Sequence, residues 1–305
     1  MTDTAREILE RWQVRKTKAQ KTAFIAWMQS RYPALRVETG GVLKSRNLIL
    51  GDVERAKVVF TAHYDTCAVL PVPNFVTPKN IAVSLLYALA LCVPLLLVMT
   101  AVCVGLLLWT GQLWLGQLGI LAVCIAFFWV LLGGRPNRHT ANDNTSGVIT
   151  LCEIYEALPP ALRAQAAFVF FDLEEAGMFG SGAFYKKHRA AMQEKLLVNF
   201  DCVSDGDHLL VIRSKKARGR FDDAVRAAFV PAEGKSVVLA RSATTLYPSD
   251  QMQFPCHVGV AAMHRRPLVG LYLGRIHTKR DTVFDERNIR WLTDAACRLT
   301  EALAQ

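Results

Sequence analysis

The sequence predicts an α/β fold: a mixed central sheet flanked by helices, with an inserted two-helix hairpin that crosses a membrane. Apolar runs with the bulk of buried strands occur within residues 57–65, 167–177 and 196–203. Residues 3–30 and 285–304 have the pattern of helices. Between the first two strands, 52 consecutive residues contain no Asp, Glu, Lys, Arg or His, which is typical of membrane-spanning segments.

Composition limits the class of protein. A chain of 305 residues is long enough for one large α/β domain or two modest ones. The net charge of +10 would allow binding to nucleic acid or to an anionic membrane surface. Of these two partners, we expect no nucleic acid. Eight cysteines without a CxxC pair argue against a disulfide scaffold and favour a reducing compartment. Residues 1–30 contain no apolar signal-peptide core, so we expect no N-terminal export.

The N-terminal region is expected to form one helix over residues 3–30, followed by a small hairpin or strand pair around Gly40-Gly41 and residues 47–51. The middle of the helix is rich in Lys and Arg. This basic face is either solvated or in contact with anionic lipid, where each basic side chain contributes about 1 kcal/mol.

The strand at residues 57–65 carries His63 and Asp65 at its end. The i, i+2 spacing puts both side chains on one side of the strand. A histidine that binds a metal usually donates its other ring N–H to a carboxylate. On its own this pair is weak evidence for a metal site.

Residues 81–132 are long enough for two membrane crossings, at 81–109 and 113–132, joined by a turn at 110–112. Trp109 and Trp114 would then lie at one interface, with Trp129 near the other. The alternative is a buried helical hairpin that packs on the enzyme or on a second subunit. Residues 80–133 are therefore predicted to be a membrane insert that contacts lipid through 81–132, and residues 1–79 and 134–305 to form the catalytic domain.

Charges around the insert predict its orientation. Lys79, Arg135 and Arg138 flank the domain-side ends of the two spans, whereas the turn between the spans carries no charge. This is the positive-inside pattern. We therefore expect an inner or plasma membrane protein with a cytoplasmic catalytic domain.

Polar residues follow the remaining predicted strands. Residues 135–147 form a polar loop that leads into a helix near Val148, and Asp201 lies near the exit of the strand at 196–203. The adjacent carboxylates Glu174 and Glu175 can place one group on a metal and leave the other free as a base. Further strands are expected at 237–241 and 268–273, with His277 just beyond the second.

Five motifs in order carry a family resemblance: His63-x-Asp65, Asn142-Asp143-Asn144 with Ser146-Gly147, Glu174-Glu175, Asn199-x-Asp201, and His277-Thr278-x-x-Asp281-Thr282. The pattern resembles the di-zinc aminopeptidases of the bacterial leucyl-aminopeptidase type, which are relatives of glutamate carboxypeptidase II and glutaminyl cyclase. The resemblance covers about residues 55–300 apart from the insert. Five ordered motifs are far more specific than any one of them.

The resemblance implies two metal ions bridged by Asp143. One ion would also bind His63 and Asp201, and the other Glu175 and His277. Two imidazoles and three carboxylates suit Zn²⁺, with cobalt or manganese possible. Paired metals lower the pKa of a shared water, polarise the scissile carbonyl and stabilise the oxyanion.

The resemblance also assigns the proton-transfer groups. Glu174 would be the general base that takes a proton from the metal-bridged water and passes it to the leaving amine. Asp65 would be the carboxylate partner of His63. The expected function is a membrane-anchored, zinc-dependent aminopeptidase that hydrolyses N-terminal residues from peptides. Carboxypeptidase or glutaminyl cyclase chemistry on the same metals, or a non-catalytic membrane scaffold, remain the alternatives, and the oligomeric state stays open.

Two features depart from the family pattern. The apolar insert separates His63 from Asp143 by 80 residues, where the family usually has a short loop. Gln251 stands where a histidine is common in the loop at residues 247–251, so the substrate-facing pocket is left undefined. Seven other side chains are expected to have no role in the site: His139, His188, His208, His257, His264, Cys67 and Cys202.

Overall fold

A nine-stranded mixed sheet forms the centre of the catalytic body, in a computed structural model that describes residues 1–305. The strand order is β1-β2-β4-β3-β5-β8-β6-β7, and β9 pairs with β8. Strands β4, β3, β5 and β8 run parallel at the centre, whereas β1, β2 and β6 join their inner neighbours antiparallel. The strands are β1 (Arg36–Gly40), β2 (Ser45–Leu50), β3 (Val58–His63), β4 (Ala166–Phe171), β5 (Leu196–Phe200), β6 (His208–Arg213), β7 (Ser236–Arg241), β8 (His257–Arg266) and β9 (Gly270–Tyr272). The predicted mixed sheet is confirmed.

Helices cover both faces of this sheet. They are α1 (Asp3–Arg11), α2 (Lys18–Arg31), α5 (Gly147–Ala157), α6 (Pro160–Arg163), α7 (Phe179–Lys187), α8 (Arg189–Met192), α9 (Lys215–Arg220), α10 (Asp222–Ala228) and α11 (Glu286–Ala304). Short turns of helix are η2 (Ala141–Ser146), η3 (Ser242–Thr244) and η4 (Asp250–Gln253).

The sheet separates the larger apolar core on one face from smaller clusters on the other. The larger core includes α1, α2, α5 and α11, the smaller one lies under α7 and α8, and a third cluster contains residues of β6, β7, β8 and β9. Successive residues of β3 point to opposite faces, so Phe60 belongs to the larger core and Val59 to the smaller. All residues of β3 and β4 are buried, which explains why these strands have continuous apolar sequences.

The N-terminal region differs from the single helix that was expected. Helix α1 ends at Arg11, and α2 begins at Lys18 behind an N-cap at Thr17. Between the two helices, the Arg15 side chain is fully buried and donates a hydrogen bond to the Tyr64 carbonyl oxygen at 2.5 Å. The middle of this region is therefore not simply a solvated or lipid-facing basic surface, because one of its cations holds the chain against the end of β3.

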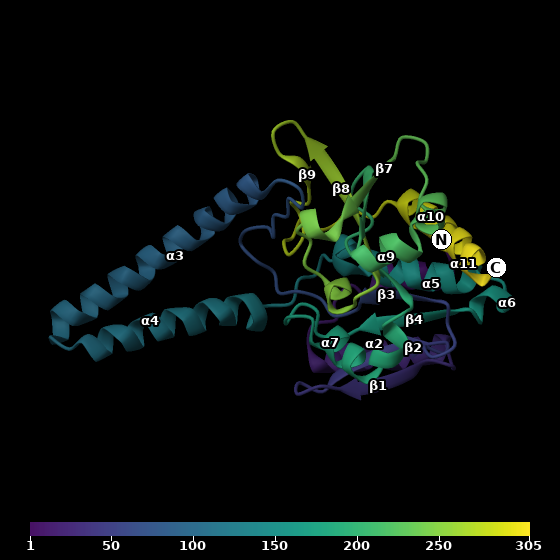
Figure 1. Cartoon of the computed structure of the whole chain (residues 1–305). Helices are drawn as coiled ribbons and strands as arrows, with labels where there is room; N and C mark the ends of the chain where they lie inside the picture. Colours follow the sequence, from purple (N-terminus) through teal and green to yellow (C-terminus); the bar gives the residue numbers. More distant parts are fainter.

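The apolar insert forms two long helices that project from the body and meet at their far ends (Figure 1). They are α3 (Ile81–Thr110) and α4 (Leu113–Phe128), and α4 continues into one turn of wider helix, η1 (Trp129–Gly133). Both are long and apolar enough to cross a membrane. No residue of α3 is buried, so the hairpin does not pack onto the catalytic body as one alternative required.

Small residues bring the two hairpin helices together. Gly116 and Gly119 are the buried residues of α4. A Cβ atom at Gly116 would lie 2.9 Å from the carbonyl oxygen of Cys103 on α3, so only glycine permits this approach. Close contact through small residues is typical of helix pairs in membranes.

Candidate metal centre

The residues predicted to bind metal lie together at one edge of the sheet. His63 ends β3, Glu175 lies in the loop after β4, and Asp201 directly follows β5. Asp143 lies in η2 and His277 in the loop beyond β9. The carboxyl ends of parallel strands meet at the same edge of a sheet, which is why residues far apart in the chain converge here.

Asp143 lies between the two histidines. Its Oδ1 is 3.4 Å from His63 Nε2, and its Oδ2 is 3.0 Å from His277 Nε2. His63 Nε2 is also 3.7 Å from Asp201 Oδ1, and His277 Nε2 is 3.3 Å from Glu175 Oε2. The five side chains thus form two groups that share one carboxylate.

This geometry fits two metal ions. Ligands at about 2.0–2.1 Å from a tetrahedral zinc are separated by about 3.3 Å. The four distances above, from 3.0 to 3.7 Å, scatter around that value. Glu175 Oε1 is buried and has no hydrogen-bond partner, so a coordinating oxygen is free. The donor set of two imidazoles and three carboxylates suits zinc.

Asp65 contacts His63 and also holds the loop that carries the two glutamates. The His63 Nδ1–H faces the Asp65 main-chain oxygen at 3.1 Å, whereas the Asp65 carboxylate is 3.6 Å away. That carboxylate also accepts the main-chain N–H groups of Glu174 and Glu175 at 3.1 and 3.2 Å. Donation from Nδ1 leaves Nε2 free to face Asp143. Asp65 therefore orients both the imidazole and the loop that carries the two glutamates.

A cleft of about 300 Å³ lies over the centre. The five candidate ligands and Glu174 all line it. Burial raises the pKa of Glu174 well above its ordinary value, opposed by the nearby His63 and reinforced by the carboxylate of Asp250. The remaining lining residues include Tyr247 and Pro248 but no lysine or arginine.

Two further polar residues hold the Asp143 loop. The Asp281 carboxylate accepts the main-chain N–H groups of Asn142 and Asp143 at 2.8 and 3.0 Å. The Asn142 side-chain oxygen accepts the N–H of Ser204 at 2.8 Å. Both residues belong to the ordered motifs, but spacing alone gave no indication of these contacts. They fix the direction of the shared carboxylate.

Gln251 does not face the cleft. It is buried, its Oε1 accepts from Asn199 Nδ2 at 2.8 Å, and its Nε2 donates to the Tyr247 carbonyl oxygen at 2.9 Å. The departure from the family pattern at this position therefore affects the packing behind the site, and Tyr247 and Pro248 supply the surface toward the substrate.

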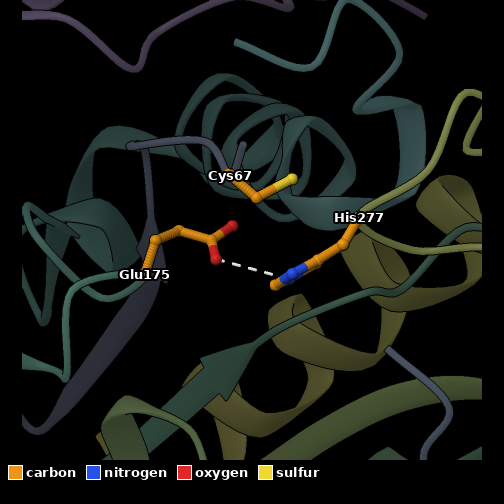
Figure 2. Close-up of side chains that lie close together, drawn as sticks. All are labelled: Cys67, Glu175 and His277. Carbon is orange, nitrogen blue, oxygen red and sulfur yellow. Dashed lines mark ion pairs between the residues drawn. The ribbon is translucent and has the colours of Figure 1, made fainter. Parts of the chain in front are cut away.

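The Cys67 thiol lies beside the candidate metal ligands and does not serve only as packing. Figure 2 shows its side chain converging with those of Glu175 and His277, and the three potential ligand atoms lie within 4.8 Å of one another. Cys202 donates a hydrogen bond from its Sγ to Asp201 Oδ1 at 3.1 Å. Both thiols were expected to have no role in the site. They follow His63 and Asp201 closely in sequence, which was the available signal.

Comparisons with known proteins agree with this architecture. The chain has a TM-score of 0.61 and 15% identity to a glutaminyl cyclase from Porphyromonas gingivalis, covering 98% of this chain and 97% of that one. The LapA aminopeptidase of Legionella pneumophila has a TM-score of 0.58 and 12% identity, and the match covers 100% of this chain and 70% of that one. A Zn-dependent exopeptidase from Parabacteroides distasonis has a TM-score of 0.54 and 14% identity, and the match covers 99% of this chain and 97% of that one. These likenesses establish the fold.

No curated protein sequence matches the chain. Residues 130–300 match the family described as Peptidase family M28, a segment that contains four of the five candidate ligands and Glu174. The chain therefore belongs to peptidase family M28 and is a metallopeptidase.

Proposed function

We propose that the protein is a membrane-anchored, zinc-dependent aminopeptidase with two zinc ions. The observation that carries the proposal is the placement of Asp143, whose two carboxylate oxygens face two different histidines at 3.4 and 3.0 Å. His63 and Asp201 would bind one ion with Asp143, and Glu175 and His277 the other. The zinc assignment is supported by the donor set and by one structural neighbour that is named as a Zn-dependent exopeptidase.

Zinc at these positions would polarise the scissile carbonyl and lower the pKa of a water molecule. The residues of the chain supply the proton transfers. Glu174 lines the cleft beside the centre, and its side chain makes no hydrogen bond or ion pair within the protein. It is free to take a proton from the attacking water at a carboxylate oxygen and to deliver it to the leaving amine. The Asp65 carboxylate holds Glu174 in place by accepting a hydrogen bond from the Glu174 main-chain N–H.

The lining of the cleft supports an aminopeptidase over a carboxypeptidase. Carboxylate groups of ligands are usually recognised by arginine or lysine. The cleft has neither, so nothing in it pairs with the C-terminal carboxylate of a peptide.

The exposed apolar helices support a membrane anchor and a division of the chain into two parts. We assign residues 1–79 and 134–305 to the catalytic domain and residues 80–133 to the membrane insert. The two apolar helices extend away from the body and expose their side chains, as a pair embedded in lipid would (Figure 1). Contact of residues 81–132 with lipid follows from this assignment.

A panel of peptides tests the activity. The detergent-solubilised protein should release the first residue from peptides with a free N-terminus and leave their N-acetylated forms intact. Chelation should abolish release, and zinc should restore it. A peptide with N-terminal glutamine belongs in the panel, because one structural neighbour is a glutaminyl cyclase. Cyclisation of that peptide without cleavage of the others, or cleavage from the C-terminus, would refute the proposal.

A further inference from the structure

An apolar cavity of about 570 Å³ lies between the base of the hairpin and the candidate metal centre. Segments near residues 65–74 form one side of it. The hairpin forms the opposite side through Tyr87 and Leu91 of α3, Phe127 of α4 and Leu131 of η1. The insert therefore contributes a wall to a space beside the active site, in addition to any role as an anchor.

This cavity adjoins the cleft over the metal centre. Glu175, His277 and Asn74 line both spaces. A peptide whose scissile bond lies at the centre can therefore extend side chains into the cavity. A volume of this size is within the range of pockets that enclose a small-molecule ligand, so it can hold more than one side chain.

The charged residues around the cavity already have partners. Lys21 forms an ion pair with Asp172 at 2.6 Å, and the Lys16 amino group donates to the Leu132 carbonyl oxygen. Asp65 accepts two main-chain N–H groups of the loop after β4. The Lys16 ammonium has no carboxylate partner, Glu175 and His277 belong to the candidate metal centre, and most of the other lining is apolar. The chemistry of the space favours an apolar occupant.

The hairpin wall lies at the level of a membrane surface. Helix α3 has 30 residues. At about 1.5 Å per residue it is about 45 Å long, which exceeds the hydrocarbon thickness of about 30 Å. Tyr87, six residues from the start of α3, lies about 9 Å along it, near the boundary between the hydrocarbon and the interfacial layer, where tyrosine is enriched. Its hydroxyl donates to the Pro73 carbonyl oxygen, which ties the helix to the catalytic body.

We infer that this cavity binds the apolar side chains beside the scissile bond of peptides that lie at the membrane surface. The inference rests on the proposed peptidase function and names its substrate class. The occupant enters from the interfacial layer, with the apolar wall of the hairpin on one side and the metal centre at the inner end. Peptides with polar residues at the same positions lose this contact.

Filling the cavity tests the assignment. Leu131→Trp places a larger side chain in the hairpin wall, and Leu121→Trp makes the same change at an exposed position of α4 as a control. Cleavage of Leu-Leu-amide and Ser-Ser-amide is measured for each protein in lipid nanodiscs. We expect the wild-type protein and the control to prefer Leu-Leu-amide by about tenfold or more. Leu131→Trp should remove most of that preference, measured as the ratio of the two cleavage rates, and the control should keep it.

Binding to the zinc-free protein separates this inference from the proposed function. Calorimetry should detect Leu-Leu-amide binding to the chelated wild type and control, and weaker binding to Leu131→Trp. The same binding, found for a protein that cleaves no peptide even when loaded with zinc, would support the cavity and refute the function. Cleavage without any difference between the two peptides or between Leu131→Trp and the control would overturn the cavity assignment alone. A phospholipid retained by wild type and lost from Leu131→Trp in native mass spectrometry, with unchanged peptide preference, would also overturn it.

Discussion

Replacing Glu174 with glutamine should abolish turnover without unfolding the protein or releasing metal. The Glu174 side chain makes no hydrogen bond or ion pair, so Gln leaves no buried partner unsatisfied. The change removes only the oxygen that accepts a proton. General base catalysis contributes about 10²–10⁴-fold to the rate, which corresponds to about 3–5 kcal/mol on the barrier. We expect a loss of that size in kcat, with substrate binding retained.

Substitution of the neighbouring Glu175 should impair metal binding and not only turnover. Its Oε2 lies 3.3 Å from His277 Nε2, within the second candidate metal group. Glu175→Ala removes one of three protein ligands from that group and leaves positive charge less neutralised. The variant should contain about one metal ion per chain, and excess zinc should restore part of its activity.

Steady-state kinetics combined with metal analysis distinguishes these two outcomes. Wild-type metal content with lost turnover is expected for Glu174→Gln, and lost metal for Glu175→Ala. If Glu174→Gln lost metal while Glu175→Ala kept both ions, the two roles would be reversed. If neither change affected turnover, the site itself would be wrongly assigned.

Three further predictions concern stability and orientation. Lys21→Met leaves the buried carboxylate of Asp172 unpaired, so unfolding should become easier by about 3–5 kcal/mol, measured by denaturant titration. Asp285→Ala removes the N-cap of α11 and should cost about 0.5–2 kcal/mol at pH 7. Hydrogen bonds from Arg287 and Lys235 lower the pKa of Asp285, so its stabilising effect is present above pH 4 or so and should diminish as the pH falls below that value. With a cytoplasmic catalytic domain, Gln112→Cys at the hairpin tip should react with an impermeant maleimide from outside intact cells, whereas domain cysteines should not.

Each of these predictions has a distinct contrary result. Lys18→Met, at an exposed position of α2, is the control for Lys21→Met, and an equal loss in both would show that the ion pair is unimportant. An Asp285→Ala deficit that grows as the pH falls would contradict the sign given above. Labelling of Cys297 in intact cells, with Gln112→Cys protected, would reverse the orientation.

Local sequence patterns were sufficient for the class of the sheet, for its strands β3, β4 and β5 and for the hairpin, but β6 and β8 were not predicted. The strands at the centre are buried on both faces, so β3 and β4 have continuous apolar sequences that are visible without a structure. The hairpin was visible because residues 81–132 contain no Asp, Glu, Lys, Arg or His. The expected spans at 81–109 and 113–132 agree with α3 and with α4 and η1 to within about one residue, a smaller error than is usual at helix ends.

Features that depend on distant contacts were not visible in the sequence. The expected helix at 3–30 is interrupted because Arg15 binds the carbonyl oxygen of Tyr64, which lies far along the chain. The Asp65 carboxylate lies 3.6 Å from His63 Nδ1, and motif spacing did not indicate that it also accepts N–H groups from the loop after β4. The cavity beside the metal centre exists only because the ends of two helices from the insert return to the catalytic body.

The order of the five motifs predicted which residues converge, and the roles of these residues remain predictions. The distances around Asp143 agree with the expected division into two groups of ligands. Cys67 shows what motif order leaves out, since its thiol lies within reach of one group without belonging to any motif. The position of such a side chain depends on how the loop after β3 folds over the site.

The most direct test of the account is the number of zinc ions bound per chain, measured by mass spectrometry of elements on purified wild-type protein and on Asp143→Ala. Asp143 is the only carboxylate within 4.0 Å of both histidines, at 3.4 and 3.0 Å. We therefore expect two zinc ions per chain in the wild-type protein, and a loss of zinc from both positions together with peptide cleavage in the variant. Full cleavage activity in metal-free wild-type protein, or two zinc ions retained by Asp143→Ala, would contradict the shared metal centre.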